Sequence, residues 1–360
     1  MSLSFHVAAS DNAIQVLQVL DLSGPNGDTG RDFSTGAKVY LDAINAKGGI
    51  HGRLVNLVLA DDQGDASRTV ALTRKLSAQY RPAALFGYMG ADNVKAVVAQ
   101  SAGSAAQLPM VAPYVGIDIA PQDDAPVYYL RAGSDDEIRK IVRIAQSSGL
   151  RRIALVAGND TLGKATVEGI RNGLSESSGT QVTNITLLPN STEVGKEARL
   201  VAQSNPDAVI LAAPTLTSAA FVRACQALRP GTQFFALSWI NPQTLAEFVG
   251  SQNVRWVAIS ALVPSPYNPV TPVARDFVQT LAKYRDEAPN YASFEGYLSA
   301  KMLVEALKKA RDGNSTALKL ALDNTNLDLG GMQLRMAPGN RRASRYVEMG
   351  VFSNAGRLVN

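Results

Sequence analysis

Glycines that follow predicted strands mark the positions at which this chain could hold a small anion. Gly90 precedes a predicted helix, and Gly116 lies in the loop after the next predicted strand. Glycine lets a ligand approach the backbone closely, and the free N–H groups of a helix N-terminus can hold a carboxylate without lysine or arginine. The N–H groups of Ala91, Asp92 and Gly116 are therefore candidates for binding a carboxylate, although both glycines could serve only to form turns.

An ammonium group on a ligand would need an acidic acceptor, for which Asp92, Asp160 and Glu295 are candidates. Each has an ordinary alternative, because the two aspartates could cap helices and Glu295 could be a solvated helix residue. The hydroxyl groups of Ser238 and Thr215 could donate hydrogen bonds to a ligand, or could equally act as N-caps.

Aromatic residues lie in or beside the same predicted loops. Tyr88, Tyr114 and Trp239 could form pocket walls, since aromatic side chains combine apolar area with a polar handle. Partial burial in the core is an equally good interpretation of each one taken separately.

Catalytic and metal chemistry find little support in the sequence. The two histidines, His6 and His51, lie far apart without metal-ligand spacing, and the single cysteine, Cys225, lies in an apolar stretch typical of a buried thiol. Gly48-Gly49 follows a predicted helix rather than a strand, which excludes a Rossmann phosphate turn there. We therefore expect no catalytic residue, no metal and no cofactor, and a hydrolase or transferase with a cleft site is the remaining enzymatic alternative.

The order of predicted elements indicates an α/β fold. A chain of 360 residues is long enough for two lobes. Short apolar runs alternate with amphipathic stretches, which predicts parallel sheets covered by helices on both faces. Strands are predicted at 16–20, 54–60, 83–86, 110–112, 127–131, 153–156, 182–187, 208–211 and 257–262, with short strands between 332 and 358. Helices are predicted at 29–46, 66–80, 94–106, 134–148, 162–175, 194–203, 218–227, 270–285 and 292–311.

Local signals place the ends of two of these helices. Gly48-Gly49 ends the helix over 29–46, as glycine does just past a C-cap. Ser134 and Glu137 are spaced as a capping box at the start of the helix over 134–148.

Composition and charge exclude several classes of partner. The net charge is +4, but no dense run of lysine and arginine with interleaved aromatics occurs, so we expect no nucleic-acid binding. No apolar run is long enough to span a bilayer. No secretory signal is visible either, and Met1-Ser2-Leu3 is interpreted as a remnant in front of a processed chain.

Two segments and a series of loops carry a family resemblance over nearly the whole chain. The segment 44–53, INAKGGIHGR, and the segment 295–300, EGYLSA, are similar to those of the extracellular solute-binding proteins of the leucine/isoleucine/valine-binding type. The loops that match in order and spacing are 22–25, 61–62, 86–90, 109–116, 159–163, 237–239, 263–266 and 329–331.

The resemblance implies a two-lobed architecture and a binding function. Each lobe would hold a parallel sheet flanked by helices, and three hinge crossovers near 125–132, 261–265 and 329–338 would join the lobes. The first lobe would comprise residues 1–125 with 263–332, and the second would comprise 126–262 with 333–360. The protein would close on a solute and deliver it to the permease of an ABC importer in the periplasm or outside the cell, most often as a monomer.

Departures from the family pattern bear on the ligand. Gly116 stands where a hydroxyl residue is common, Leu162 replaces an aromatic residue, and Ser238 corresponds to the acid that pairs with a ligand ammonium. The expected ligand is a small aliphatic or aromatic amino acid of the branched-chain type. The alternatives are a small carboxylate without an amine, such as an aromatic acid, and a soluble ligand sensor of the same fold.

The loops after the strands of both lobes supply the predicted ligand-binding residues. They are Ser23, Tyr88, Gly90, Ala91, Asp92, Tyr114, Val115, Gly116, Asp160, Leu162, Thr215, Ser238, Trp239 and Glu295.

Overall fold

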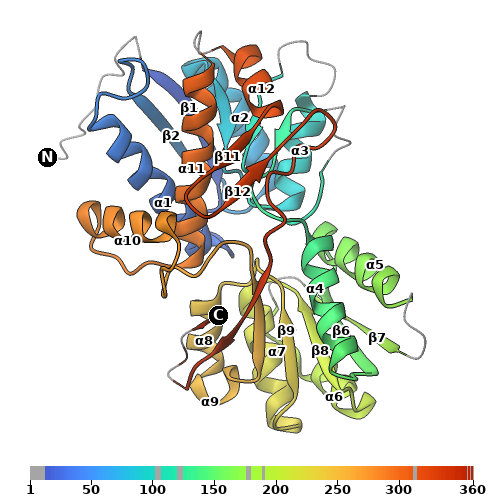
Figure 1. Cartoon of the computed structure of the whole chain (residues 1–360). Helices are drawn as coiled ribbons and strands as arrows, with labels where there is room; N and C mark the ends of the chain where they lie inside the picture. Colours follow the sequence, from blue (N-terminus) through green and yellow to red (C-terminus); the bar gives the residue numbers. More distant parts are fainter. Residues whose placement is uncertain are drawn as a thin grey trace, which may run out of the picture.

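The chain folds into two α/β lobes, one above the other in Figure 1. The computed structural model describes residues 13–101, 107–119, 125–175, 180–188, 191–310, 314–354, 356 and 358–359. His6, Met1-Ser2-Leu3 and the predicted helix ends at Ala106 and Arg311 lie outside the described residues.

The first lobe is built on a parallel sheet of five strands in the order β2-β1-β3-β4-β5. Its strands are β1 (Ile14–Leu20), β2 (Val55–Asp61), β3 (Ala84–Phe86), β4 (Met110–Val111) and β5 (Val127–Tyr128). Its helices are α1 (Gly27–Asn45), α2 (Ala66–Tyr80), α3 (Ala91–Ser101), α10 (Pro272–Tyr284), α11 (Tyr291–Lys309) and α12 (Ser315–Asp323).

The second lobe contains a seven-stranded sheet in the order β14-β13-β10-β9-β8-β6-β7, in which β13 and β14 pair antiparallel at one edge. Its strands are β6 (Arg152–Gly158), β7 (Gln181–Leu187), β8 (Ala208–Ala212), β9 (Gln233–Ala236), β10 (Val257–Ala261), β13 (Glu348–Phe352) and β14 (Leu358–Val359). Its helices are α4 (Ser134–Ser147), α5 (Thr161–Ser175), α6 (Gly195–Ser204), α7 (Thr215–Leu228), α8 (Pro242–Val249) and α9 (Ser251–Val254).

Both sheets are buried on their two faces, as the apolar strand runs predict. Val16 and Leu20 of β1 belong to one apolar cluster, whereas Leu17 and Val19 belong to another. Because successive side chains of a strand point to opposite faces, the two clusters lie on opposite sides of the sheet. The predicted α/β class with helices on both faces is therefore confirmed.

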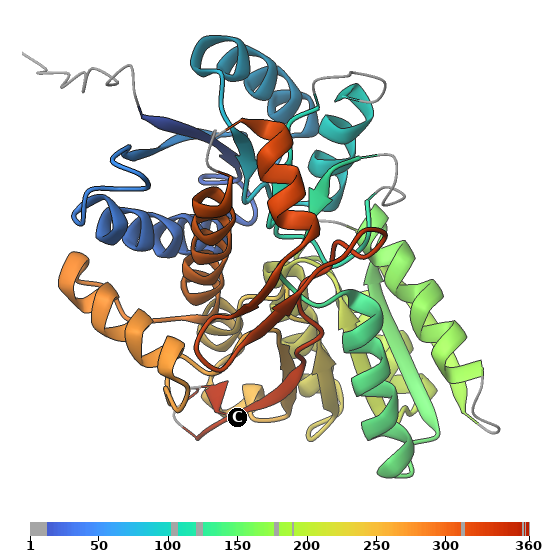
Figure 2. The ribbon, with the colours of Figure 1, turned by 45° about the horizontal axis from the view of Figure 1, so that its top comes forward.

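Three segments cross between the lobes, namely 129–133, 262–271 and 336–347. Two of the predicted boundaries are wrong. β5 follows residue 125 but pairs with β4 of the first lobe, and β12 (Gln333–Arg335) follows residue 332 but pairs with β11 (Asn326–Asp328). The hairpin lies beside α11 and α12 in Figures 1 and 2, and Leu334 belongs to the apolar core of the first lobe. Strand pairing over distant residues decides these limits, and no break in composition marks them.

The closest packing in the first lobe joins α1 to α11 through two glycines. A Cβ atom at Gly36 would lie 1.7 Å from the carbonyl oxygen of Ser293, and one at Gly296 would lie 1.9 Å from that of Phe33. Only glycine permits this approach of two helix backbones. The middle of α1 is thus packed against a segment that follows about 260 residues later.

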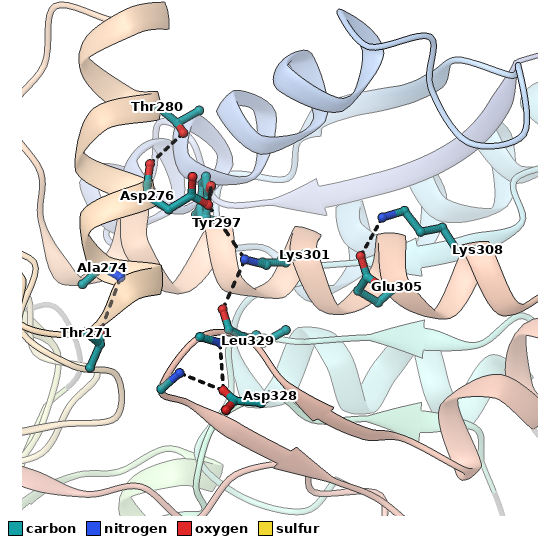
Figure 3. Close-up of polar contacts among 12 residues, drawn as sticks. Thr271, Ala274, Asp276, Thr280, Tyr297, Lys301, Glu305, Lys308, Asp328 and Leu329 are labelled. Carbon is teal, nitrogen blue, oxygen red and sulfur yellow. Dashed lines mark hydrogen bonds and ion pairs between the residues drawn. The ribbon is translucent and has the colours of Figure 1, made fainter.

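Polar contacts fix α11 against its other neighbours, as Figure 3 shows. The hydroxyl of Tyr297 donates to Asp276 of α10 at 2.6 Å, and the ammonium of Lys301 donates to the carbonyl of Leu329 at 3.2 Å. Asp328 accepts from the N–H groups of Gly330 and Gly331 and so closes the turn between β11 and β12. These contacts hold α11 rigidly and therefore fix the position of Glu295 in its first turns.

The structure agrees with the predicted end of α1 and differs from the predicted start of α4. α1 ends at Asn45, and Gly48 and Gly49 follow with positive φ angles of 96° and 75°. The capping box predicted for Ser134 and Glu137 is wrong by one residue, because Gly133 is the N-cap of α4 and Asp136 accepts from its N–H. Glu137 is thereby free to point into the protein interior, where it is fully buried.

Candidate ligand-binding site

A pocket of about 350 Å³ lies between the lobes, at the carboxyl ends of strands from both sheets. The first lobe contributes the start of α1, the start of α3 and the loop after β4. The second lobe contributes the start of α5, the loop after β8 and Trp239 after β9. The lining residues are Pro25, Asn26, Thr29, Gly64, Met89, Gly90, Ala91, Asp92, Asn93, Tyr114, Val115, Gly116, Arg131, Asp160, Leu162, Ala212, Ala213, Pro214 and Trp239.

The structure brings together most of the residues singled out in the sequence. Those that line this pocket are Gly90, Ala91, Asp92, Tyr114, Val115, Gly116, Asp160, Leu162 and Trp239. Those that do not are Ser23, Tyr88, Thr215, Ser238 and Glu295.

Three of the residues outside the pocket have structural partners instead. Ser23 is exposed and donates to Asp61 at 2.5 Å. Tyr88 is fully buried among the apolar residues on the other face of the sheet, and its hydroxyl contacts that of Thr73 at 2.9 Å. Thr215 accepts the N–H of Asn241 at 3.0 Å. The placement of these side chains in the pocket is therefore wrong.

The start of α3 presents backbone N–H groups to the pocket. Gly90 has a φ of +87° and its carbonyl accepts from Val94, which closes the first helical turn. The N–H groups of Ala91, Asp92 and Asn93 precede this bond and have no acceptor within the helix. Together with the partial positive charge of the helix start, they suit a carboxylate.

Both acidic residues of the pocket already bind partners of their own. Asp160 accepts the N–H of Gly163 at 2.7 Å and so caps α5. Asp92 is exposed and accepts from the hydroxyl of Thr161 in the other lobe. One oxygen of each carboxylate is thus engaged by these contacts.

The indole of Trp239 reaches across from the second lobe to the loop of the first. A Cβ atom at Gly116 would lie 3.3 Å from the Trp239 ring and 3.7 Å from Leu162. The absence of a side chain at Gly116 therefore gives these two residues room when the lobes are together.

Further contacts between the lobes close the rim of the pocket. The amide of Asn241 donates to Thr29 at 3.4 Å, and the hydroxyl of Thr244 donates to Asp28. The lobes are thus in contact on the side that bears α1 and α8, as well as at Asp92 and Thr161.

Sequence analysis missed Arg131, which lies in the first crossover and lines the pocket. Its side chain is only 1% exposed. The guanidinium carbon lies 4.0 Å from the centre of the Tyr114 ring, Nε lies 3.2 Å from a carboxylate oxygen of Glu295, and Nη2 donates to the hydroxyl of Ser238 at 2.9 Å. The sequence did contain a signal for Arg131, because this arginine stands within an apolar crossover segment. A charge in such a segment is buried only together with partners, which indicates a polar cluster around it.

Ser238 and Glu295 therefore hold Arg131 rather than line the main pocket. A second buried acid, Glu137, accepts the N–H of Ser238 at 2.8 Å and the hydroxyl of Ser260. Burial raises the pKa of both Glu137 and Glu295, although the Arg131 charge opposes this effect. For the cationic Arg131, burial acts in the opposite direction and lowers the pKa. The neighbouring carboxylates outweigh burial and raise the pKa of Arg131 overall.

The described part of the chain shows no cluster of metal-binding side chains and no membrane-spanning helix. Among those residues, no group of three or more histidine, cysteine, aspartate or glutamate side chains is arranged to hold a metal ion. Within the same residues, none of the helices combines the length and apolarity needed to cross a bilayer.

Two hinged α/β lobes with a solute-sized pocket between them define a binding protein, and the comparison with known families agrees. Residues 13–357 match the periplasmic binding protein family, and the chain belongs to it. Relatives and structures of this family are solute-binding proteins and not enzymes. The family serves ABC importers, which implies small-molecule ligands, a permease partner and a periplasmic or extracellular location.

The chain is similar to individual relatives and solved structures over nearly its whole length. It is 23% identical to the Leu/Ile/Val-binding protein homolog 7 of Brucella melitensis, over 96% of this chain and 90% of the relative. Among solved structures, a substrate-binding periplasmic protein from Ralstonia solanacearum is 29% identical, with a TM-score of 0.89 over 96% of this chain and 99% of that one. A fatty acid ABC transporter substrate-binding protein from Thermomonospora curvata shares the fold at 18% identity, with a TM-score of 0.85 over 98% of this chain and 92% of that one.

Proposed function

We propose that this solute-binding protein captures a small carboxylic acid with an apolar body. The observation that carries the proposal is the start of α3, where the N–H groups of Ala91 and Asp92 face a pocket together with the loop at Gly116. A helix N-terminus stabilises a carboxylate through unpaired donors and the helix dipole. Tyr114, Leu162 and Trp239 supply apolar area for the remainder of the solute.

An amino acid of the aliphatic or aromatic type is one candidate ligand. The name of the Brucella relative points to leucine, isoleucine and valine, and Asp160 and Asp92 stand at the pocket as acceptors for an ammonium. Their existing contacts with Gly163 and Thr161 reduce what they can offer to a ligand.

A carboxylic acid without an amine is the second candidate, and the inner wall of the pocket favours it. Ser238 stands where the family resemblance places an acid, and its hydroxyl is bound by the cationic Arg131. The Thermomonospora curvata protein, which shares the fold, is named as a fatty acid ABC transporter substrate-binding protein, and this supports the second candidate.

Capture requires that the solute favour the closed arrangement of the lobes. The pocket is lined from both lobes, so a solute that contacts both walls stabilises closure, as does every contact between Asp92 and Thr161 or Asp28 and Thr244. A ligand shifts such an equilibrium only by its differential affinity for the two arrangements.

Isothermal titration with each acid and its primary amide tests the proposal. We expect a carboxylate to bind and its primary amide, which lacks the charge, to bind about tenfold or more weakly, because charge-assisted hydrogen bonds to the α3 start are lost. Equal binding of acid and amide would refute a carboxylate site. Light scattering with and without ligand would test the expected monomer.

A further inference from the structure

The guanidinium of Arg131 is incompletely paired although it is buried. Nη1 has no hydrogen-bond partner among the described residues, and Nε lies near Glu295 without forming a well-directed hydrogen bond to the described residues. Buried donors without an acceptor are costly, more so on a charged group. Because Arg131 also lines the pocket, a solute in the pocket is the natural source of the missing acceptor.

The charges around Arg131 are arranged in layers. Glu295 and Glu137 do not line the main pocket, whereas Arg131 does. Ser238 separates Arg131 from Glu137, since its hydroxyl accepts from the guanidinium and its N–H donates to the carboxylate. A solute therefore meets the cation first, with the carboxylates behind it.

Arg131 contacts the loop that carries part of the proposed carboxylate site. Its guanidinium packs on the ring of Tyr114, which is two residues before Gly116 in the same loop. A solute group that reaches Arg131 while the carboxylate binds near Gly116 is therefore expected beside the carboxylate, and carbon 2 of the acid is the nearest position that can carry it.

We propose that Arg131 is a specificity-determining residue that donates from Nη1 to an oxygen acceptor on carbon 2 of the solute. The preferred solutes are thus acids with an oxo or hydroxyl group at this carbon. An ammonium on carbon 2 would place a second positive charge beside the Arg131 guanidinium, and the guanidinium offers it no hydrogen-bond acceptor. This inference rests on the proposed carboxylate site and names the solute class within it.

Three acids with one carbon skeleton test this preference by titration calorimetry. They are 4-methyl-2-oxopentanoate, 4-methylpentanoate and leucine, and the phenyl series of phenylpyruvate, 3-phenylpropanoate and phenylalanine covers an aromatic solute. We expect the oxo acid to bind about 10- to 100-fold more tightly than the acid without the oxo group, as for a hydrogen bond to a charged group. The amino acid should bind weakest.

Variants separate a direct contact from a structural role. Arg131→Met combined with Glu295→Gln removes the guanidinium together with the carboxylate that pairs with it directly, while Glu137 keeps its hydrogen bonds from Ser238 and Ser260. We expect the affinity ratio of oxo acid to plain acid to fall to about 1, while the plain acid binds within a few-fold of the parent protein. Glu295→Gln alone is the reference, because it keeps the guanidinium, and its ratio should exceed that of the double variant at least tenfold. Arg131→Lys offers a second test if the double variant does not fold, with a ratio reduced at least tenfold.

The outcomes distinguish this inference from the proposed function. If the oxo and plain acids bind equally, or leucine or phenylalanine binds most tightly in its series, the role of Arg131 is refuted while the carboxylate site stands. A ratio unchanged in the double variant or in Arg131→Lys refutes it as well. If no acid of either series binds, the proposed function fails and this inference fails with it.

Discussion

Replacement of Gly296 by alanine is expected to destabilise the first lobe severely. The added Cβ would lie 1.9 Å from the carbonyl oxygen of Phe33 and 2.8 Å from its carbonyl carbon. Ordinary contact needs roughly 3.5 Å, so α1 and α11 must separate by about 1.5 Å. Backbone atoms cannot move aside as a flexible side chain does, and the separation loosens the whole interface between the two helices.

The magnitude follows from two opposing effects. Alanine gains about 1 kcal/mol over glycine in a helix interior. Overpacking in a well-packed core costs typically about 1–3 kcal/mol and occasionally more, and a forced separation of two backbones belongs at the upper end. We therefore expect a net loss of about 2 kcal/mol in the free energy of unfolding, which lowers Tm by about 4–8 °C for a lobe of this size.

Differential scanning calorimetry of Gly296→Ala beside a matched control provides the assay. Gly173 lies inside α5, where a Cβ would meet Val142 at 3.7 Å and Ile138 at 3.8 Å, both ordinary contacts. Gly173→Ala should thus add up to about 1 kcal/mol to the free energy of unfolding and raise Tm slightly. A Gly296→Ala protein as stable as the parent would show that the approach of α1 and α11 does not depend on glycine.

Three further predictions concern pH, closure and the lobe contacts. Burial raises the pKa of Asp32 to about 6, above its unfolded value of about 3.9. The folded protein therefore binds more protons than the unfolded chain and loses stability, by no more than about 3 kcal/mol, as pH rises from about 4 to 6. Asp32→Asn should remove this loss, measured as the difference in Tm between pH 4.5 and 7.5, and an unchanged difference would contradict the prediction. Gly116→Val should weaken solute affinity about tenfold or more, because its side chain meets Trp239 upon closure; unchanged affinity by titration calorimetry would contradict this. Thr244→Val should weaken affinity only about twofold to fivefold, because it removes one hydrogen bond to Asp28 that forms between the lobes, whereas a larger effect would indicate direct contact with the solute.

The sequence predicts the framework of this protein well, because local patterns determine it. Apolar runs of β1 and β6 and the glycine pair after α1 depend on neighbours within a few residues. The loops that line the pocket follow from the same patterns, since ligands bind at the carboxyl ends of strands in such sheets. Gly90, Gly116 and Trp239 are thus found by position alone.

The errors have one physical origin, which is dependence on distant partners. Tyr88 is adjacent to the pocket residue Met89, but successive residues of an extended segment face opposite sides of a sheet. Arg131 becomes significant only when Ser238 and Glu295, more than 100 residues away, come to it. No spacing within the sequence announces such a cluster.

The close packing of α1 on α11 through Gly36 and Gly296 has a consequence for how the chain acquires its structure during synthesis. α1 is made early, yet the helix that covers it follows about 260 residues later. At a translation rate of roughly 5–20 residues per second, α1 waits about 13–50 s for its partner. Most of the second lobe, from α4 to β10, is complete before that moment, so the lobe that begins the chain is among the last parts to be finished.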